Sequence, residues 1–201
     1  MFRRLSLAFA GLVLLAGAAS ASVDVYVIDA AHSEASFQVR HLVTKVRGRF
    51  TDISGAVRVD RDNPAASEVE FRIKVASIDT ANEQRDTHLR SPDFFDVEKH
   101  PEITFRSSGV EPQGDNMYAV TGTLTMHGVS KEVVLFVQHL GFMKGPRGGE
   151  KGGFETAVTL DRKDYGIVWN MALDTGGFIL GDEVKVEINL EVSKQEEEKQ
   201  D

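Results

Sequence analysis

The sequence predicts an all-β protein, namely an eight-stranded antiparallel barrel with a short helical insertion around residues 81–96. Two observations lead to this prediction. Apolar and polar residues alternate in one segment after another, most strictly in residues 68–75 and 184–192, as in strands with one buried and one solvated face. The second observation is that one stretch, around residues 81–96, departs from this alternation. Eight such strands can remove their exposed edges by closing into a barrel, and a two-sheet sandwich with a solid core is the alternative that the pattern leaves open.

Short turn signals separate the expected strands. The strands cover residues 36–40, 48–59, 68–75, 102–110, 117–126, 131–138, 154–160 and 184–192. Asn63-Pro64, Gly114-Asp115-Asn116 and His127-Gly128 are the clearest turns between them. Strands joined in this way pair antiparallel, and their polar faces exclude the central strands of a parallel sheet, which are apolar on both sides. A closed barrel of eight strands can hold one ligand.

The helical insertion is predicted from its first residues. Thr80-Ala81-Asn82-Glu83 matches a capping box, with Thr80 as N-cap and Glu83 reaching back, so a helix is expected over residues 81–90. Ser91-Pro92 ends it. Phe94 and Phe95 follow outside any expected strand, and we expect them to plug one end of the barrel or to lie at its mouth.

The first 21 residues predict an export signal. Arg3 and Arg4 precede an apolar stretch over residues 5–17, and Ala19-Ser20-Ala21 has the small-residue pattern of a cleavage site. The apolar stretch is shorter than the roughly 20 residues of a spanning helix. We therefore expect cleavage after Ala21 and a periplasmic protein without a stable membrane anchor.

The remaining chain is expected to form one barrel domain, residues 22–193, followed by a charged mobile tail, residues 194–201. There is no cysteine, which excludes disulfides and a lipid anchor on cysteine. The formal charge is −8, and removal of residues 1–21, which hold two arginines and no acid, brings it to −10. Binding of nucleic acid by general electrostatics is therefore not expected.

Motifs for catalysis and for metal binding are not found in the sequence. It has no G-x-S-x-G elbow and no cysteine nucleophile, and no two histidines have the i, i+4 spacing of a zinc protease. Capping explains the acidic residues that cluster between Asp79 and Asp93. The Gly-rich residues 145–153 lack the Lys-Ser/Thr ending of a phosphate-binding loop and predict a long hairpin loop instead. We therefore expect no enzyme, no cofactor and no metal site.

Short motifs run in order along nearly the whole chain after residue 28. They are Asp29-x-x-His32-Ser33, Phe37-x-Val39-x-His41, Val46-x-Gly48-x-Phe50, Ser77-Ile78-Asp79-Thr80, Arg85-Asp86-x-His88-Leu89-x-Ser91-x-Asp93-Phe94-Phe95-Asp96, Pro101-x-Ile103-Thr104-Phe105, Gly122-x-Leu124-Thr125-x-His127-Gly128-Val129, Arg162-x-Asp164-Tyr165-Gly166-Ile167 and Gly181-Asp182-Glu183-Val184. With these motifs the chain resembles the YceI-like family of exported, lipocalin-like proteins, which are implicated in binding polyisoprenoid lipids. The resemblance implies a barrel with a helical insertion and an elongated cavity.

The expected function is to hold a long-chain isoprenoid lipid, such as a polyprenyl phosphate or an isoprenoid quinone, inside the barrel for storage or transport. The expected lipid-binding residues are Phe37, Phe50, Phe71, Ile73, Phe94, Phe95, Phe105, Leu124, Phe136, Phe154 and Trp169. Arg85 and His88 could meet a polar head group, or Arg85 and Asp86 could fix the helix to the rim. The alternatives are a fatty acid or fatty amide ligand, and a stress-related structural protein with a filled barrel and a protein partner. A homodimer is left open.

Overall fold

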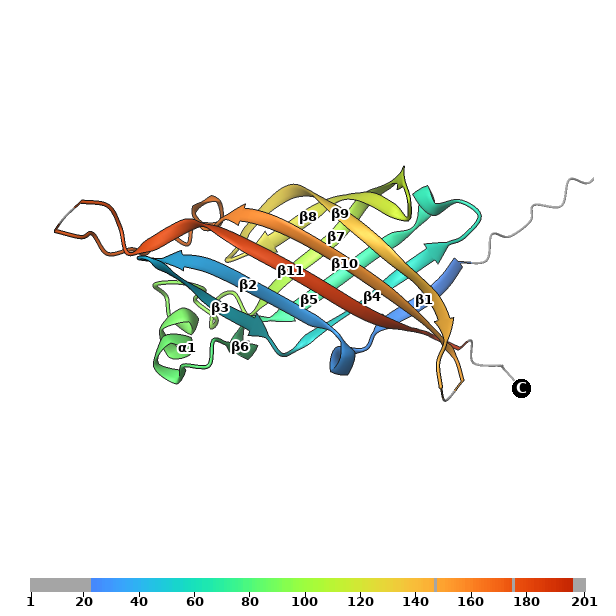
Figure 1. Cartoon of the computed structure of the whole chain (residues 1–201), viewed down its shortest axis with the longest axis horizontal. Coiled ribbons are helices and arrows are strands. Elements are labelled where there is room, and N and C mark those ends of the chain that lie inside the picture. Colours follow the sequence, from blue (N-terminus) through green and yellow to red (C-terminus); the bar gives the residue numbers. More distant parts are fainter. Residues whose placement is uncertain (1–22, 147, 175, 197–201) are drawn as a thin grey trace, which may run out of the picture.

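The structure is a computed structural model that describes residues 23–146, 148–174 and 176–196. The expected signal peptide, residues 1–21, lies outside the described residues, as do residues 197–201 of the expected tail. The described part is an elongated barrel of antiparallel strands with one α-helix at one end (Figure 1). No helix within this part is both long enough and apolar enough to cross a bilayer.

Eight strands form a closed antiparallel ring. In the order of their pairing they are β1 (Val23–Ile28), β4 (Ile53–Asp60), β5 (Glu68–Lys74), β7 (Glu102–Gly114), β8 (Met117–Met126), β9 (Val129–Lys144), β10 (Glu150–Asp161) and β11 (Leu180–Lys194). The ring closes because β11 pairs with β1, with Ile28 opposite Val192. The predicted eight-stranded barrel is therefore confirmed, and the sandwich alternative is wrong.

Three further strands extend the wall at the helical end. They are β2 (Glu34–His41), β3 (Thr44–Phe50) and β6 (Ile78–Asp79). β2 pairs with the first half of β11, while β1 pairs with its second half, so β1 and β2 follow one path that the 3-10 turn Ala30–His32 interrupts. β3 continues into β4 in the same way, which explains why residues 48–59 read as one strand in the sequence.

The sequence missed β1 because its alternation is inverted. Tyr26 is fully buried, whereas Val23 and Val27 are 46% and 43% exposed. The final strand is also longer than expected. Lys194, placed by the sequence at the start of a mobile tail, pairs with Tyr26 as the last residue of β11, and its Nζ lies 2.5 Å from Asp24.

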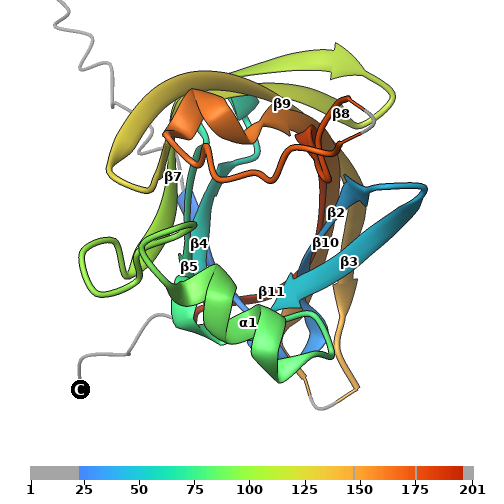
Figure 2. The same ribbon diagram turned by 90° about the vertical axis from the view of Figure 1, so that its left-hand side faces the viewer.

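The helix α1 (Glu83–Arg90) begins two residues later than predicted. Its N-cap is Asn82, whose side-chain oxygen accepts a hydrogen bond from the backbone N–H of Arg85 at 2.9 Å. Thr80 cannot cap the helix because Ala81, with φ of 58°, turns the chain between them. Figure 2 views the helical end and shows α1 on the opposite side of the barrel from the loop that follows β10.

Candidate functional site

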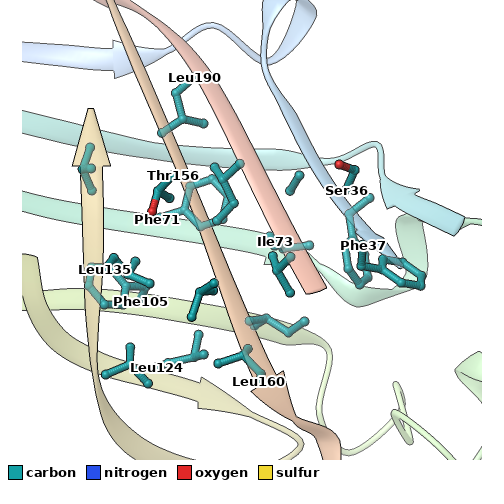
Figure 3. Close-up of a pocket in the computed structure, with 18 of the residues that line it drawn as sticks. Ser36, Phe37, Phe71, Ile73, Phe105, Leu124, Leu135, Thr156, Leu160 and Leu190 are labelled. Atoms are coloured by element: carbon teal, nitrogen blue, oxygen red, sulfur yellow. The ribbon is translucent and has the colours of Figure 1, made fainter. Parts of the chain in front are cut away.

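A cavity of about 630 Å³ runs through the barrel, and side chains from the ring strands and from α1 line it. Most of these side chains are apolar. Strand alternation places them there: Phe71 and Ile73 on β5 face inward, opposite Phe105 and Ile103 on β7. Figure 3 shows Phe71, Ile73, Phe105, Leu124, Leu135 and Leu160 pointing into the same space.

The structure brings together all but one of the residues that the sequence selected for the apolar lining. Phe37, Phe50, Phe71, Ile73, Phe94, Phe95, Phe105, Leu124, Phe154 and Trp169 line the cavity. Gly48 on β3 makes room for Phe37, because a Cβ at Gly48 would lie 2.5 Å from the tip of the Phe37 ring.

Phe136 is the exception, and its expected place in the cavity is wrong. It lies on the outer face of β9 and is 59% exposed, whereas its neighbours Leu135 and Val137 line the cavity. Residues 133–137 are all apolar, so period-two alternation could not tell which face of β9 points inward. Pairing Ala119 with Phe136, and not with Leu135, fixes the register.

Arg85 and His88 both reach the cavity at the helical end, but each has partners from the chain. Arg85 donates from Nε to the Thr80 hydroxyl and from Nη2 to the Thr80 carbonyl, both at 2.8 Å. The Nε2 atom of His88 lies 2.8 Å from Asp93. These bonds hold Arg85 against Thr80, which lies between β6 and α1.

The helical end also holds an aromatic cluster. The His88 ring lies edge-on to Phe94 and to Trp169, with centroids 5.0 and 4.9 Å apart. Phe94 and Trp169 lie 5.1 Å from one another. These three rings form the cavity wall between α1 and the loop after β10.

Sequence reasoning gave no role to Arg162, which positions Trp169. Its guanidinium is 4% exposed and donates to the carbonyls of Ile167 (2.7 Å), Trp169 (2.8 Å) and Gly181 (2.9 Å). One buried side chain thus ties the loop after β10 to the start of β11. Its place in one of the family motifs was the only signal in the sequence.

A polar and aromatic cluster lies at the opposite end of the barrel. The Tyr26 hydroxyl contacts the Glu150 carboxylate and accepts from Arg61 Nη2 at 2.6 Å. Phe142 stacks on Tyr26, with centroids 4.9 Å apart, and lies 4.6 Å from the Arg61 guanidinium. Burial and the bond to Glu150 raise the pKa of Tyr26 to about 12, so the phenol stays neutral.

Next to this cluster, His139 lies between aromatic rings. Its ring centroid is 4.4 Å from that of Phe142 and 5.0 Å from that of Phe154. Its Nε2 atom is buried and has no hydrogen-bond partner among the described residues. Burial lowers the pKa of His139, the charge of Arg61 acts in the same direction, and a backbone hydrogen bond with Gly141 opposes both.

One group of side chains outside the cavity has the composition of a metal site. Oxygen and nitrogen atoms of Asp29, His32 and Glu191 lie within 4.8 Å of one another. Lys151 occupies the same place, with Nζ 2.8 Å from Asp29 and 3.0 Å from Glu191. Hydrogen bonds from Lys151 and His32 lower the pKa of Asp29 to about 2. The group is an ion-pair network that joins the β1–β2 turn to β10 and β11.

Known proteins share this sequence pattern. The profile of the YceI-like domain matches residues 26–192. The UPF0312 protein of Azotobacter vinelandii is 40% identical over 156 residues, which are 76% of this chain and 81% of that protein. Protein YceI of Escherichia coli is 38% identical over 164 residues, which are 81% of this chain and 85% of that protein.

Solved structures share the barrel. BcnA from Burkholderia cenocepacia is 27% identical and superposes with a TM-score of 0.71 over 82% of this chain and 98% of BcnA. The YceI protein of Campylobacter jejuni is 34% identical, with a TM-score of 0.67 over 78% of this chain and 90% of that protein. A polyisoprenoid binding domain from Saccharophagus degradans is 19% identical, with a TM-score of 0.63 over 85% of this chain and 98% of that domain, and this likeness concerns the fold.

Proposed function

The chain belongs to the YceI-like domain family, and we propose that it is a binding protein that holds a long-chain isoprenoid lipid inside its barrel. The observation that carries this proposal is the elongated, apolar cavity of about 630 Å³ between α1 and the Arg61 end. A ligand that fills it must be long and largely apolar. The name of the Saccharophagus degradans domain, which describes it as polyisoprenoid binding, agrees with this ligand class.

The free energy of moving a long hydrocarbon chain from water into the cavity suits a carrier protein. Each methylene-like carbon that leaves water contributes about 0.8 kcal/mol, and ordering the flexible chain offsets part of this gain. A lining of plain hydrocarbon discriminates only weakly between chains that differ by one carbon. We therefore propose storage or transport of a polyprenyl phosphate or an isoprenoid quinone, with no catalytic step. Export to the periplasm after cleavage at Ala21 is part of the same proposal and is supported by the leader pattern.

The polar end of the ligand is proposed to lie near Arg85 and His88. Both side chains line the cavity at the helical end, and His88 is part-exposed beside the aromatic cluster. Because Arg85 already donates to Thr80, it would meet a phosphate only with its remaining N–H groups. A fatty acid or fatty amide is the second candidate, since the same lining accepts any long hydrocarbon.

Mass spectrometry of the organic extract tests the proposal on protein purified gently from the periplasm of its own host. A stoichiometric polyprenyl or quinone species is expected. A fatty acid or fatty amide in its place would establish the second candidate. An empty extract, together with no binding of apolar dyes by the purified protein, would contradict a lipid carrier and favour a filled barrel with a protein partner.

A further inference from the structure

Large apolar side chains are exposed on two loops at the helical end of the barrel. They are Leu42 and Val43 at the β2–β3 turn, and Val168, Met171 and Phe178 in the loop before β11. Their exposed fractions run from 46% for Leu42 to 88% for Val43. We call these five side chains the apolar rim.

The two loops are joined to one another. The backbone N–H of Leu42 donates to the carbonyl of Ile179 at 2.8 Å, and that of Ile179 donates to the carbonyl of Met171 at 3.0 Å. In Figure 1 the β2–β3 turn and the loop before β11 lie together at the left end, which Figure 2 views from outside. The apolar rim is thus one assembly on a hydrogen-bonded frame.

The apolar rim also borders the cavity. His41, Trp169 and Leu180 line the cavity, and each lies within two residues of a rim side chain. A chain that leaves the cavity at this end therefore passes directly beside the apolar rim.

The β2–β3 turn is an unfavourable place for apolar residues. Leu42 has a φ of 50°, a conformation that suits Asn or Gly and is rare for a bulky side chain. Gly in place of Leu42 would adopt this φ without strain. A strained apolar residue followed by the most exposed hydrophobic residue of the described chain points to selection for contact, because strain is retained mainly at functional places.

We infer that the apolar rim inserts into the surface of a lipid bilayer and so brings the mouth of the cavity against the acyl chains. This inference rests on the proposed function, since it supplies the path by which a water-insoluble ligand enters without crossing water. Apolar side chains beside an interfacial tryptophan are suited to the boundary between head groups and acyl chains. Arg40, which donates to the Val43 carbonyl at 3.4 Å, and exposed Lys45 lie behind this tip, at the level of lipid phosphates.

The charge of the protein decides which bilayer it contacts. The formal charge is −8 for the whole chain and −10 without residues 1–21, which hold two arginines and no acid, so a strongly anionic surface repels the protein as a whole. Contact therefore depends on apolar insertion, and it is expected on neutral phosphatidylcholine vesicles and at high salt, where screened charges contribute little.

The experiment uses the full mature chain with phosphatidylcholine vesicles. The chain has a single tryptophan, Trp169, which lines the cavity and also neighbours the rim residue Val168, so quenching of its emission by brominated acyl chains counts as insertion only where the rim variants reduce it. Co-sedimentation gives the partition coefficient. Val43→Asp and Phe178→Asp are each expected to weaken partitioning about tenfold, because each puts a charge in place of an inserted side chain.

Phe136→Asp is the matched control. Phe136 is 59% exposed, close to the 62% of Phe178, but it lies on the outer face of β9, away from the rim. It is expected to leave partitioning within about twofold of the unmodified chain. All variants must still bind an apolar dye in their cavity, which shows that each is folded.

Several results would overturn the inference. They are dye binding without any vesicle binding, an equal loss of partitioning in Phe136→Asp and the rim variants, and vesicle binding that disappears at high salt. Concentration-dependent dimers that the rim variants abolish would assign the rim to a second copy of the chain and would also overturn it. Failure of the unmodified chain to bind any apolar dye would instead contradict the proposed function.

Discussion

Leu135 and Phe136 are adjacent on β9 and face opposite sides of the barrel wall. Leu135 lines the cavity and Phe136 is exposed. Leu135→Trp is expected to occupy part of the cavity and to weaken binding of a long prenol at least about tenfold, because each carbon kept out forfeits about 0.8 kcal/mol. Phe136→Trp is expected to leave the affinity unchanged. Displacement of a fluorescent apolar probe measures both, and equal effects would contradict a ligand path along β9.

His139 limits the stability of the barrel. Its unpaired, buried Nε2 atom carries an uncompensated desolvation cost, and the rings of Phe142 and Phe154 would pack as well on a benzene ring. His139→Phe is expected to raise the free energy of unfolding by about 1 kcal/mol at pH 7.5. Urea denaturation measures this change. A loss of stability would show that the polar contacts of the ring, including its backbone hydrogen bond with Gly141, outweigh the desolvation cost of Nε2.

The same substitution changes the pH dependence. Burial lowers the pKa of His139 below its ordinary value of 6.5, so the unfolded chain takes up a proton first as the pH falls. The stabilising contribution is therefore complete above pH 6.5 and is lost as the pH falls below it through the folded-state pKa. Between pH 7.5 and 5.5 the unmodified protein is expected to lose more stability than His139→Phe. Parallel urea titrations at both pH values test this expectation.

The interior side chains show what period-two alternation can and cannot settle at a single residue. In residues 184–192 every second residue is charged or polar, so the inward positions followed from the sequence. In residues 133–137 both faces are apolar, and only the pairing with β8 decides between them. Arg162 could not be assigned a role because three of its partners are backbone carbonyls, which have no signature in the sequence, and its side-chain partner Asp182 lies 20 residues further along the chain.

At the scale of elements, α1 is fixed to the wall by a buried polar network around Thr80. The Thr80 hydroxyl donates to Asp86 Oδ1 at 2.5 Å and accepts from Arg85 Nε at 2.8 Å. The Thr80 N–H also donates to Asp86 at 3.0 Å. The capping box correctly predicted a helix in this segment, but it wrongly assigned Thr80 as the N-cap. Tertiary contacts turned Thr80 inward and left the cap to Asn82.

Thr80→Val tests this network. The replacement keeps the shape of the side chain and removes both hydroxyl hydrogen bonds, so the buried Asp86 carboxylate keeps only its backbone donor. The free energy of unfolding is expected to fall by about 2 kcal/mol, as is usual for a lost hydrogen bond to a charged group. Thr159→Val, on the exposed face of β10, is the control and is expected to have little effect. Thermal and urea unfolding of both variants would measure the difference.

At the scale of the whole molecule, the closed barrel was expected from the sequence, but the strand pair that closes it, β1 with β11, was not. The number of strands and their alternation limited the fold to a closed barrel or a two-sheet sandwich, because strands with one apolar face each must close or stack, and the family resemblance favoured the barrel. The closure through β1 could not be predicted, since Asp24 and Tyr26 occupy the positions where apolar residues would be expected. Tyr26 is buried there with Arg61 and Glu150, which are distant in sequence and carry no motif.

The two ends of the barrel differ, and this difference is expected to set how ligands of different length bind. At the end away from α1 the cavity reaches Arg61, Asn116 and Phe142, and we expect the Tyr26 cluster beside them to stop a chain that enters at the helical end. Within a series of prenols of increasing length, affinity is expected to rise by up to about 0.8 kcal/mol for each added carbon that is buried. Beyond the length that fills about 630 Å³, further carbons stay in water or in the bilayer and the affinity levels off. Competition against a fluorescent apolar probe gives the curve. An affinity that rises without levelling would contradict a closed end, and one that never depends on length would contradict binding of the chain inside the barrel.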